Sequence, residues 1–223
     1  MRSDGSSEAC TTLSREGTNL ISSRLIWLLV AAVGFAAAIA YVYPDRAIHA
    51  WSIGTAYSSF FLIAWALCLG PVNVIRGDAN PVHSPLRRDV GIAGGVIAVV
   101  HTVIGLQVHM GGQLSRYFLL QPVMHKPDVL FLAANWIGLV STLLLTGLVT
   151  ISNNPSLRRL GLETWKFFQR WAYPAAALVV LHGVAFQLLE KRSKPLMALV
   201  LVITLVVVGL QLKGRSIKLH KAG

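Results

Sequence analysis

The chain has 223 residues, of which 54% are hydrophobic and only 13% carry a charge. Because about a quarter of the residues in soluble domains are charged, the composition predicts an integral membrane protein. The formal net charge of +11 does not indicate a protein that binds nucleic acid, since the basic residues cluster between apolar runs rather than along one soluble face.

The order of polar and apolar segments predicts the fold. Residues 1–24 are polar and rich in serine and threonine, and we expect a disordered cytoplasmic tail there. Six uncharged runs follow, and each meets or approaches the length of a membrane-spanning helix. We therefore predict an all-α fold, a polytopic membrane helical bundle of six transmembrane helices over 25–212, and a basic cytoplasmic tail over 213–223. The runs are 25–44, 47–75, 90–115, 129–157, 171–189 and 195–212.

The distribution of lysine and arginine predicts the orientation. If both termini are cytoplasmic, fourteen of these residues lie on the cytoplasmic side and six on the other side. This bias agrees with the positive-inside rule, although the short basic loop over 191–194 runs against it. We expect a multi-pass protein of the bacterial inner membrane with both termini in the cytoplasm. The third and fifth helices then run parallel, toward the periplasm.

Two of the predicted helices carry a histidine at the same depth. His101 lies eleven residues after Val90, and His182 lies eleven residues after Trp171. At 1.5 Å per residue, each is about 16 Å into the membrane. Neutral imidazole is a common axial ligand of haem iron, and an ionisable residue at this depth is a functional candidate by default. The matched depth favours His101 and His182 as the two metal ligands of a haem b that transfers electrons.

Small residues near the two histidines would leave room for a flat macrocycle between the helices. They would equally allow close packing of membrane helices, with each histidine forming only a hydrogen bond across the bundle. These residues are Gly94, Gly95 and Gly105 near His101, and Ala175, Ala176 and Gly183 near His182.

Two other interpretations compete with a haem protein. One is a haem-free membrane scaffold, and the other is a metal or small-molecule transporter that uses His101, His109 and His182 along a path. The uncharged runs contain no acidic residue that could form an ion relay, which argues against a transporter. His109 is open to a propionate contact, a quinone contact or a purely interfacial role. The remaining histidines are expected in loops or the tail, without a role: His49, His83, His125 and His220.

Two arginine pairs lie at the predicted cytoplasmic turns. Arg87-Arg88 precedes the third helix, and Arg158-Arg159 follows the fourth. These pairs could bind haem propionates, anionic lipid headgroups or an acidic redox partner, or could act only as topology determinants.

Several motifs together resemble the ferric-reductase-like transmembrane domain family. Within it, the chain looks most like the haem-binding membrane subunits of bacterial periplasmic methionine-sulfoxide reductase systems, the MsrQ or YedZ type. The resemblance covers about residues 50–210 and implies a six-helix membrane cytochrome b that moves electrons across the membrane. The motifs are Leu86-Arg87-Arg88 followed thirteen residues later by His101, then Ser152-Asn153, Leu157-Arg158-Arg159-Leu160-Gly161, Trp165-Lys166 and Leu181-His182.

One position departs from the family pattern. Members usually carry a second histidine thirteen residues before the inner one of the fifth helix, and here that position is Gln169. Glutamine is not a usual haem ligand, so we expect one haem per chain.

The absence of a nucleotide-binding motif bears on the electron donor. No Gly-rich phosphate loop follows a predicted strand, so the expected donor is quinol or a separate flavoprotein. Quinone or flavin (FMN) is a further candidate cofactor, and a periplasmic reductase is the candidate acceptor. The expected role is an electron-transfer subunit of a reductase system, embedded in the lipid bilayer, with no catalytic residue of its own.

Overall fold

The computed structural model describes residues 22–42, 46–77, 85–119, 129–191 and 194–222. Within these ranges the chain forms helices and turns but no strand, and six helices are long and apolar enough to span a membrane. The predicted fold class, a polytopic helical membrane bundle, is therefore confirmed. The polar segment 1–24 lies almost wholly outside the described residues, and so do His83 and His125.

The long helices follow the predicted apolar runs closely. They are α2 (Ser23–Val42), α3 (Ala47–Arg76), α4 (Pro85–Val108), α6 (Val129–Ile151), α9 (Ala172–Leu189) and α10 (Lys194–Ala222). The shorter elements are η2 (Met110–Gly112), α5 (Leu114–Phe118), α7 (Asn154–Leu160) and α8 (Leu162–Gln169).

Two predicted runs end earlier in the structure, for local reasons. The third run continues to residue 115, but α4 ends at Val108, and Gly111 and Gly112 then adopt φ angles of 59° and 74°. Glycine adopts this left-handed conformation readily because it has no β-carbon, and the helix ends there. The fourth run continues to residue 157, but α6 ends at Ile151 because the Asn153 side chain caps α7, accepting a 2.7 Å hydrogen bond from the Ser156 amide.

The C-terminal basic segment is helical. α10 continues through the predicted end of the sixth run at residue 212 to Ala222, so 213–222 extends the helix by several turns. A β-carbon at Gly214 would lie 3.1 Å from Pro71 of α3, and the close approach there holds this extension against the bundle. The boundary predicted at 212 is therefore a change of composition and not a change of structure.

Helix α3 is the central element, because it packs against α2, α4 and α10. Ser58 donates a 3.1 Å hydrogen bond to the Ala32 carbonyl of α2, and Ser59 donates a 2.9 Å hydrogen bond to the Gly94 carbonyl of α4. A β-carbon at Gly94 would lie 3.0 Å from Ile63 of α3, so the two helix backbones approach closely. Small residues and polar links of this kind hold helices together where lipid supplies no hydrophobic driving force.

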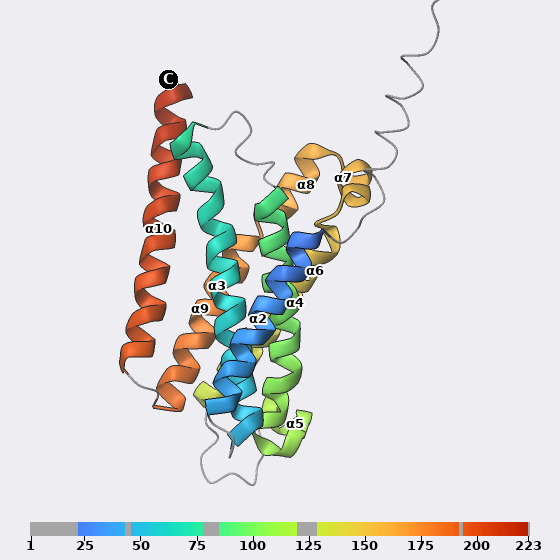
Figure 1. Ribbon diagram of the computed structural model, residues 1–223, viewed down its shortest axis with the longest axis vertical. Coiled ribbons are helices and arrows are strands. Elements are labelled where there is room, and N and C mark those ends of the chain that lie inside the picture. Colours follow the sequence, from blue (N-terminus) through green and yellow to red (C-terminus); the bar gives the residue numbers. More distant parts are fainter. Residues whose placement is uncertain (1–21, 43–45, 78–84, 120–128, 192–193, 223) are drawn as a thin grey trace, which may run out of the picture.

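The helix directions agree with the predicted topology. Figure 1 shows the start of α2, the end of α3 and the end of α10 at the same end of the bundle as α7 and α8, with α5 at the opposite end. Helices α4 and α9 both run from the α7–α8 end toward the α5 end. The third and fifth spans are therefore parallel, as they must be for His101 and His182 to lie at the same depth.

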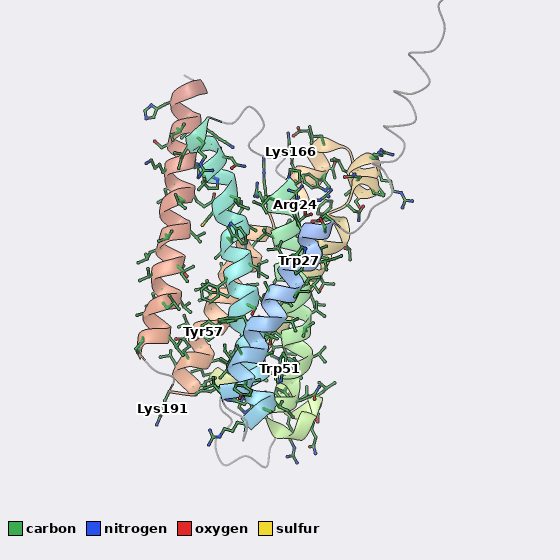
Figure 2. The ribbon with its side chains drawn as sticks, in the orientation of Figure 1. Arg24, Trp27, Trp51, Tyr57, Lys166 and Lys191 are labelled. Atoms are coloured by element: carbon green, nitrogen blue, oxygen red, sulfur yellow. The ribbon has the colours of Figure 1, made fainter. Side chains whose placement is uncertain are left out.

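Basic residues gather at the α7–α8 end. Figure 2 labels Arg24 and Lys166 at that end and Lys191 at the opposite end. Under the positive-inside rule, this asymmetry supports the prediction that the α7–α8 end faces the cytoplasm.

Reporter fusions test this orientation. A fusion at residue 223 and one near residue 80 are expected to report the cytoplasm, and one near residue 120 the periplasm, because the basic residues at the α7–α8 end retain that end inside. The reversed pattern would contradict the orientation. A periplasmic signal at residue 223 alone would show that the final hairpin does not form.

Candidate functional site

A cavity of about 140 Å³ lies among α3, α4, α6 and α9. Helix α6 packs against both α4 and α9, and the cavity lies between these two parallel helices. His101 of α4 and His182 of α9 both line the cavity, and their ring centres are 6.2 Å apart with the ring planes at 73°. The structure thus brings together the two histidines that the sequence singled out for their matched depth.

Both histidines are oriented by hydrogen bonds to helix carbonyls. The Nδ1 atom of His101 lies 3.0 Å from the Ser52 carbonyl oxygen of α3, and that of His182 lies 2.8 Å from the Ala134 carbonyl oxygen of α6. A carbonyl oxygen only accepts hydrogen bonds, so Nδ1 carries the proton in both rings. Nε2 is then the nitrogen whose lone pair can coordinate a metal.

Glycine is required where α6 passes the His182 ring. A β-carbon at Gly138 would lie 2.6 Å from both the Cε1 and the Nδ1 atoms of His182, closer than real side chains approach. On the other side of the cavity, a β-carbon at Gly105 would lie 3.8 Å from the His101 Cε1 atom. Gly138 therefore fixes the position of one imidazole by allowing its ring to lie against the helix backbone.

The small residues predicted to make room for a macrocycle divide into two groups. Gly105 and Gly183 line the cavity, as expected. Gly94 and Gly95 do not, because Gly94 faces α3 and Gly95 packs against Val149 of α6. Adjacent residues of a helix point to different faces, so Gly94 contacts α3 while Gly95 contacts α6.

The end of the cavity toward α5 is lined by an acidic residue and a histidine, and a second histidine contacts the acidic residue from outside the lining. Glu190, which follows α9, lies with one carboxylate oxygen 3.3 Å from His49 Nε2 and with the other 3.4 Å from His109 Nε2. The expectation that His49 lies in a loop is wrong, since it lies in the first turn of α3, where it contacts Glu190. We call these three residues the Glu190 cluster.

The sequence carries a signal for the Glu190 cluster in the positions of its three residues along the apolar runs. His49 lies at the start of the second apolar run, while His109 and Glu190 lie toward the ends of the third run and the fifth. In the predicted topology these three positions are on the same side of the membrane. The expectation that no acidic residue takes part in the membrane core needs correction, because Glu190 reaches the same cavity as the two paired histidines.

Aromatic rings connect the Glu190 cluster to the histidine pair. The Phe186 ring centre is 4.9 Å from that of His182 and 6.3 Å from that of His109, on which it stacks with an interplanar angle of 20°. His109 is held in turn by Tyr117, whose hydroxyl accepts a 2.8 Å hydrogen bond from the His109 amide and donates to the His109 carbonyl. Tyr117 is 1% exposed, so the hydroxyl that holds the His109 backbone is part of a fully buried side chain.

One buried acceptor in the cavity has no partner among the described residues. Gln187 is 5% exposed, and its Nε2 atom donates a 3.3 Å hydrogen bond to the Tyr57 hydroxyl. Its Oε1 atom is buried without a hydrogen bond. Buried polar atoms in native proteins are nearly always paired, so this atom is expected to accept a hydrogen bond from a donor such as an ordered water molecule.

The four candidate arginines do not line the cavity. Arg87 packs against Gly70 near the α7–α8 end, and Arg88 donates a 3.2 Å hydrogen bond to Asn154 at the start of α7. Arg158 and Arg159 are exposed on α7. The structure therefore brings His101 and His182 together but leaves the arginines at the end of the bundle.

Gln169 also lies away from the histidine pair. Its Nε2 atom donates a 3.2 Å hydrogen bond to the Ser152 hydroxyl and so joins the end of α8 to the end of α6. In the part of the chain that the structure describes, no three His, Cys, Asp or Glu residues form a metal-binding group. A haem differs from such a site, since its macrocycle supplies most of the iron ligands and the protein supplies the axial ones.

The fold and the site together define a class: a six-span membrane protein with two carbonyl-oriented histidines facing each other in a core cavity. The chain is similar to the protein-methionine-sulfoxide reductase heme-binding subunit MsrQ of Deinococcus radiodurans, with 32% identity over 133 residues. The match covers 58% of this chain and 59% of the length of that relative. It supports the resemblance that the sequence motifs indicated. No family model matches the chain, and no solved structure matches it.

Proposed function

We propose that this chain is a haem-binding electron-transfer subunit of the membrane. It carries electrons from a quinol or a separate flavoprotein through one bis-histidine haem b to an acceptor on the periplasmic side. The observation that carries the proposal is the pairing of His101 with His182 at 6.2 Å across the cavity. The similarity to a heme-binding subunit supports the same conclusion.

The spacing of the two rings fits an iron held between them. A bond between a metal and an imidazole nitrogen is about 2 Å long, and two such bonds plus the two ring radii separate ring centres by about 6 Å. The observed separation is 6.2 Å.

When bound, the haem supplies one-electron redox chemistry. His101 and His182 would fill both axial positions, so no position stays open for oxygen. The Ser52 and Ala134 carbonyls hold the two imidazoles in one tautomer and raise their basicity as ligands. Apolar side chains make up much of the cavity lining, and an apolar shell of this kind would tune the potential of the iron.

The positions of Gln169 and the arginines support one haem per chain rather than two. Gln169 is joined to Ser152, and the arginine pairs lie outside the cavity. Because Arg158 and Arg159 are exposed on α7, they suit the docking of an acidic donor protein better than the binding of propionates. Electrons would then enter at the α7–α8 end and leave toward the α5 end.

The axial ligands are tested by alanine substitution. His101→Ala and His182→Ala are each expected to abolish or greatly weaken haem retention, because each removes one of two bonds to the iron. The measurement is the haem absorbance per chain of the purified protein. His109→Ala is the matched control, since it removes a histidine from the same cavity and leaves both ligands, and its spectrum should stay nearly unchanged. Full haem occupancy in His182→Ala would contradict the assignment.

Gly138 is tested as a positioning residue. Gly138→Ala forces the His182 ring away from α6, and we expect about a tenfold loss of haem affinity, similar to the loss of an outer-shell partner of a metal ligand. Gly147→Ala is the matched control on the same helix, because no atom lies within 4 Å of a β-carbon there. The measurement is haem titration followed by absorbance. Equal affinities for the two variants would show that Gly138 does not position the ligand.

A further inference from the structure

We propose that the Glu190 cluster is a proton-binding site whose occupancy follows the redox state of the iron held between His101 and His182. The inference rests on the proposed function and adds a proton to the electron that the subunit carries. The cluster takes up a proton from the outer aqueous side when the iron is reduced and releases it to that side when the iron is oxidised.

The geometry of the Glu190 cluster suits proton binding. His49 lies at the start of α3, His109 directly follows α4 and Glu190 directly follows α9. One Glu190 carboxylate oxygen is 3.3 Å from His49 Nε2, and the other is 3.4 Å from His109 Nε2. An ionised carboxylate only accepts hydrogen bonds, so both His49 and His109 present an Nε2–H to it. The added proton therefore goes to an imidazole Nδ1 atom, and the charge of the cluster changes from −1 to 0.

The surroundings of the Glu190 cluster allow it to exchange protons with water, but they limit the screening of its charge by water. The Glu190 side chain is 17% exposed, while those of His49 and His109 are 33% and 34% exposed. Histidine is the side chain whose ordinary titration range includes neutral pH, and a carboxylate in contact stabilises its charged form. The contact of two imidazoles with one partly exposed carboxylate thus gives an added proton a place to bind.

Coupling between the Glu190 cluster and the iron follows from their shared cavity. His109 stacks on Phe186, which contacts His182, so one aromatic ring separates the cluster from an axial ligand. Charges separated by low-dielectric protein interact more strongly than charges in water. Reduction adds one negative charge at the iron centre, and one proton at the cluster compensates it. The only bond that forms is the N–H bond of an imidazole.

The ionisable groups that the structure describes at this end include three basic residues and one tyrosine outside the Glu190 cluster. Lys191 follows Glu190, Arg46 precedes α3 and Arg116 lies on α5, and all three are exposed. Burial raises the pKa of the Tyr117 hydroxyl, which outweighs the lowering by its hydrogen bond to the His109 backbone, so Tyr117 stays neutral. The described residues that α6 and α10 contribute to the cavity are uncharged.

Redox titration of the haem at several pH values tests the proposal on the full chain in detergent or nanodiscs. Between about pH 5.5 and 8.5, where histidine titrates, the midpoint potential of the wild type should fall as pH rises. The slope should approach 59 mV for each tenfold change in proton concentration. Glu190→Gln should lose most of this slope and keep a bis-histidine spectrum, because it leaves both ligands in place.

Two further variants make the result specific. Glu163→Gln removes a carboxylate from exposed α8 at the opposite end, and it should keep the wild-type slope. His109→Gln repeats the test if Glu190→Gln does not fold, and it should also lose slope. Redox-difference infrared spectra should contain a carboxylate band in the wild type that Glu190→Gln lacks.

The outcomes separate the two proposals. A haem-loaded wild type whose potential does not change with pH would overturn the proton site and leave the electron-transfer proposal standing. An unchanged slope in both Glu190→Gln and His109→Gln would assign the proton to another group and would also overturn it. A purified wild type that binds no haem would overturn both proposals.

Discussion

Two hydrogen bonds from imidazole to helix carbonyls set the geometry on which the site depends. In a membrane helix every carbonyl normally pairs within the helix, so a carbonyl that also accepts from a histidine ties that side chain to a fixed position in the backbone. The Ser52 and Ala134 carbonyls do this for His101 and His182 from two different helices, α3 and α6. Four helices therefore form the site: α4 and α9 supply the two imidazole rings, and α3 and α6 orient them.

Much of the fold could be predicted from the sequence because lipid imposes simple rules. Runs of uncharged residues must form spanning helices, and their order alone makes the third and fifth spans parallel. Equal offsets of His101 and His182 from the starts of their runs then predicted that the rings would meet. Helix ends were predicted less well, since the end of α4 depends on the left-handed backbone at Gly111 and Gly112, which hydropathy does not register.

The parts of the site that sequence analysis missed depend on tertiary structure. The sequence places Glu190, His49 and His109 on the same side of the predicted membrane, but they are far apart along the chain. Only the packing of α3, α4 and α9 brings His49 and His109 to its two oxygens. The same limit applies to Gly94 and Gly138: both are glycines in apolar helices, but one serves helix packing and the other makes room for the His182 ring.

The central claim is that one iron lies between His101 and His182, and the haem content of the purified wild type tests it most directly. The measurement combines the molar ratio of haem to protein with the electron paramagnetic resonance spectrum of the oxidised protein. The account predicts one haem per chain with a low-spin ferric signal, as two imidazole ligands would produce. A ratio near two would show that a second ligand pair exists, and a high-spin signal or the absence of haem would contradict the pairing of the two histidines.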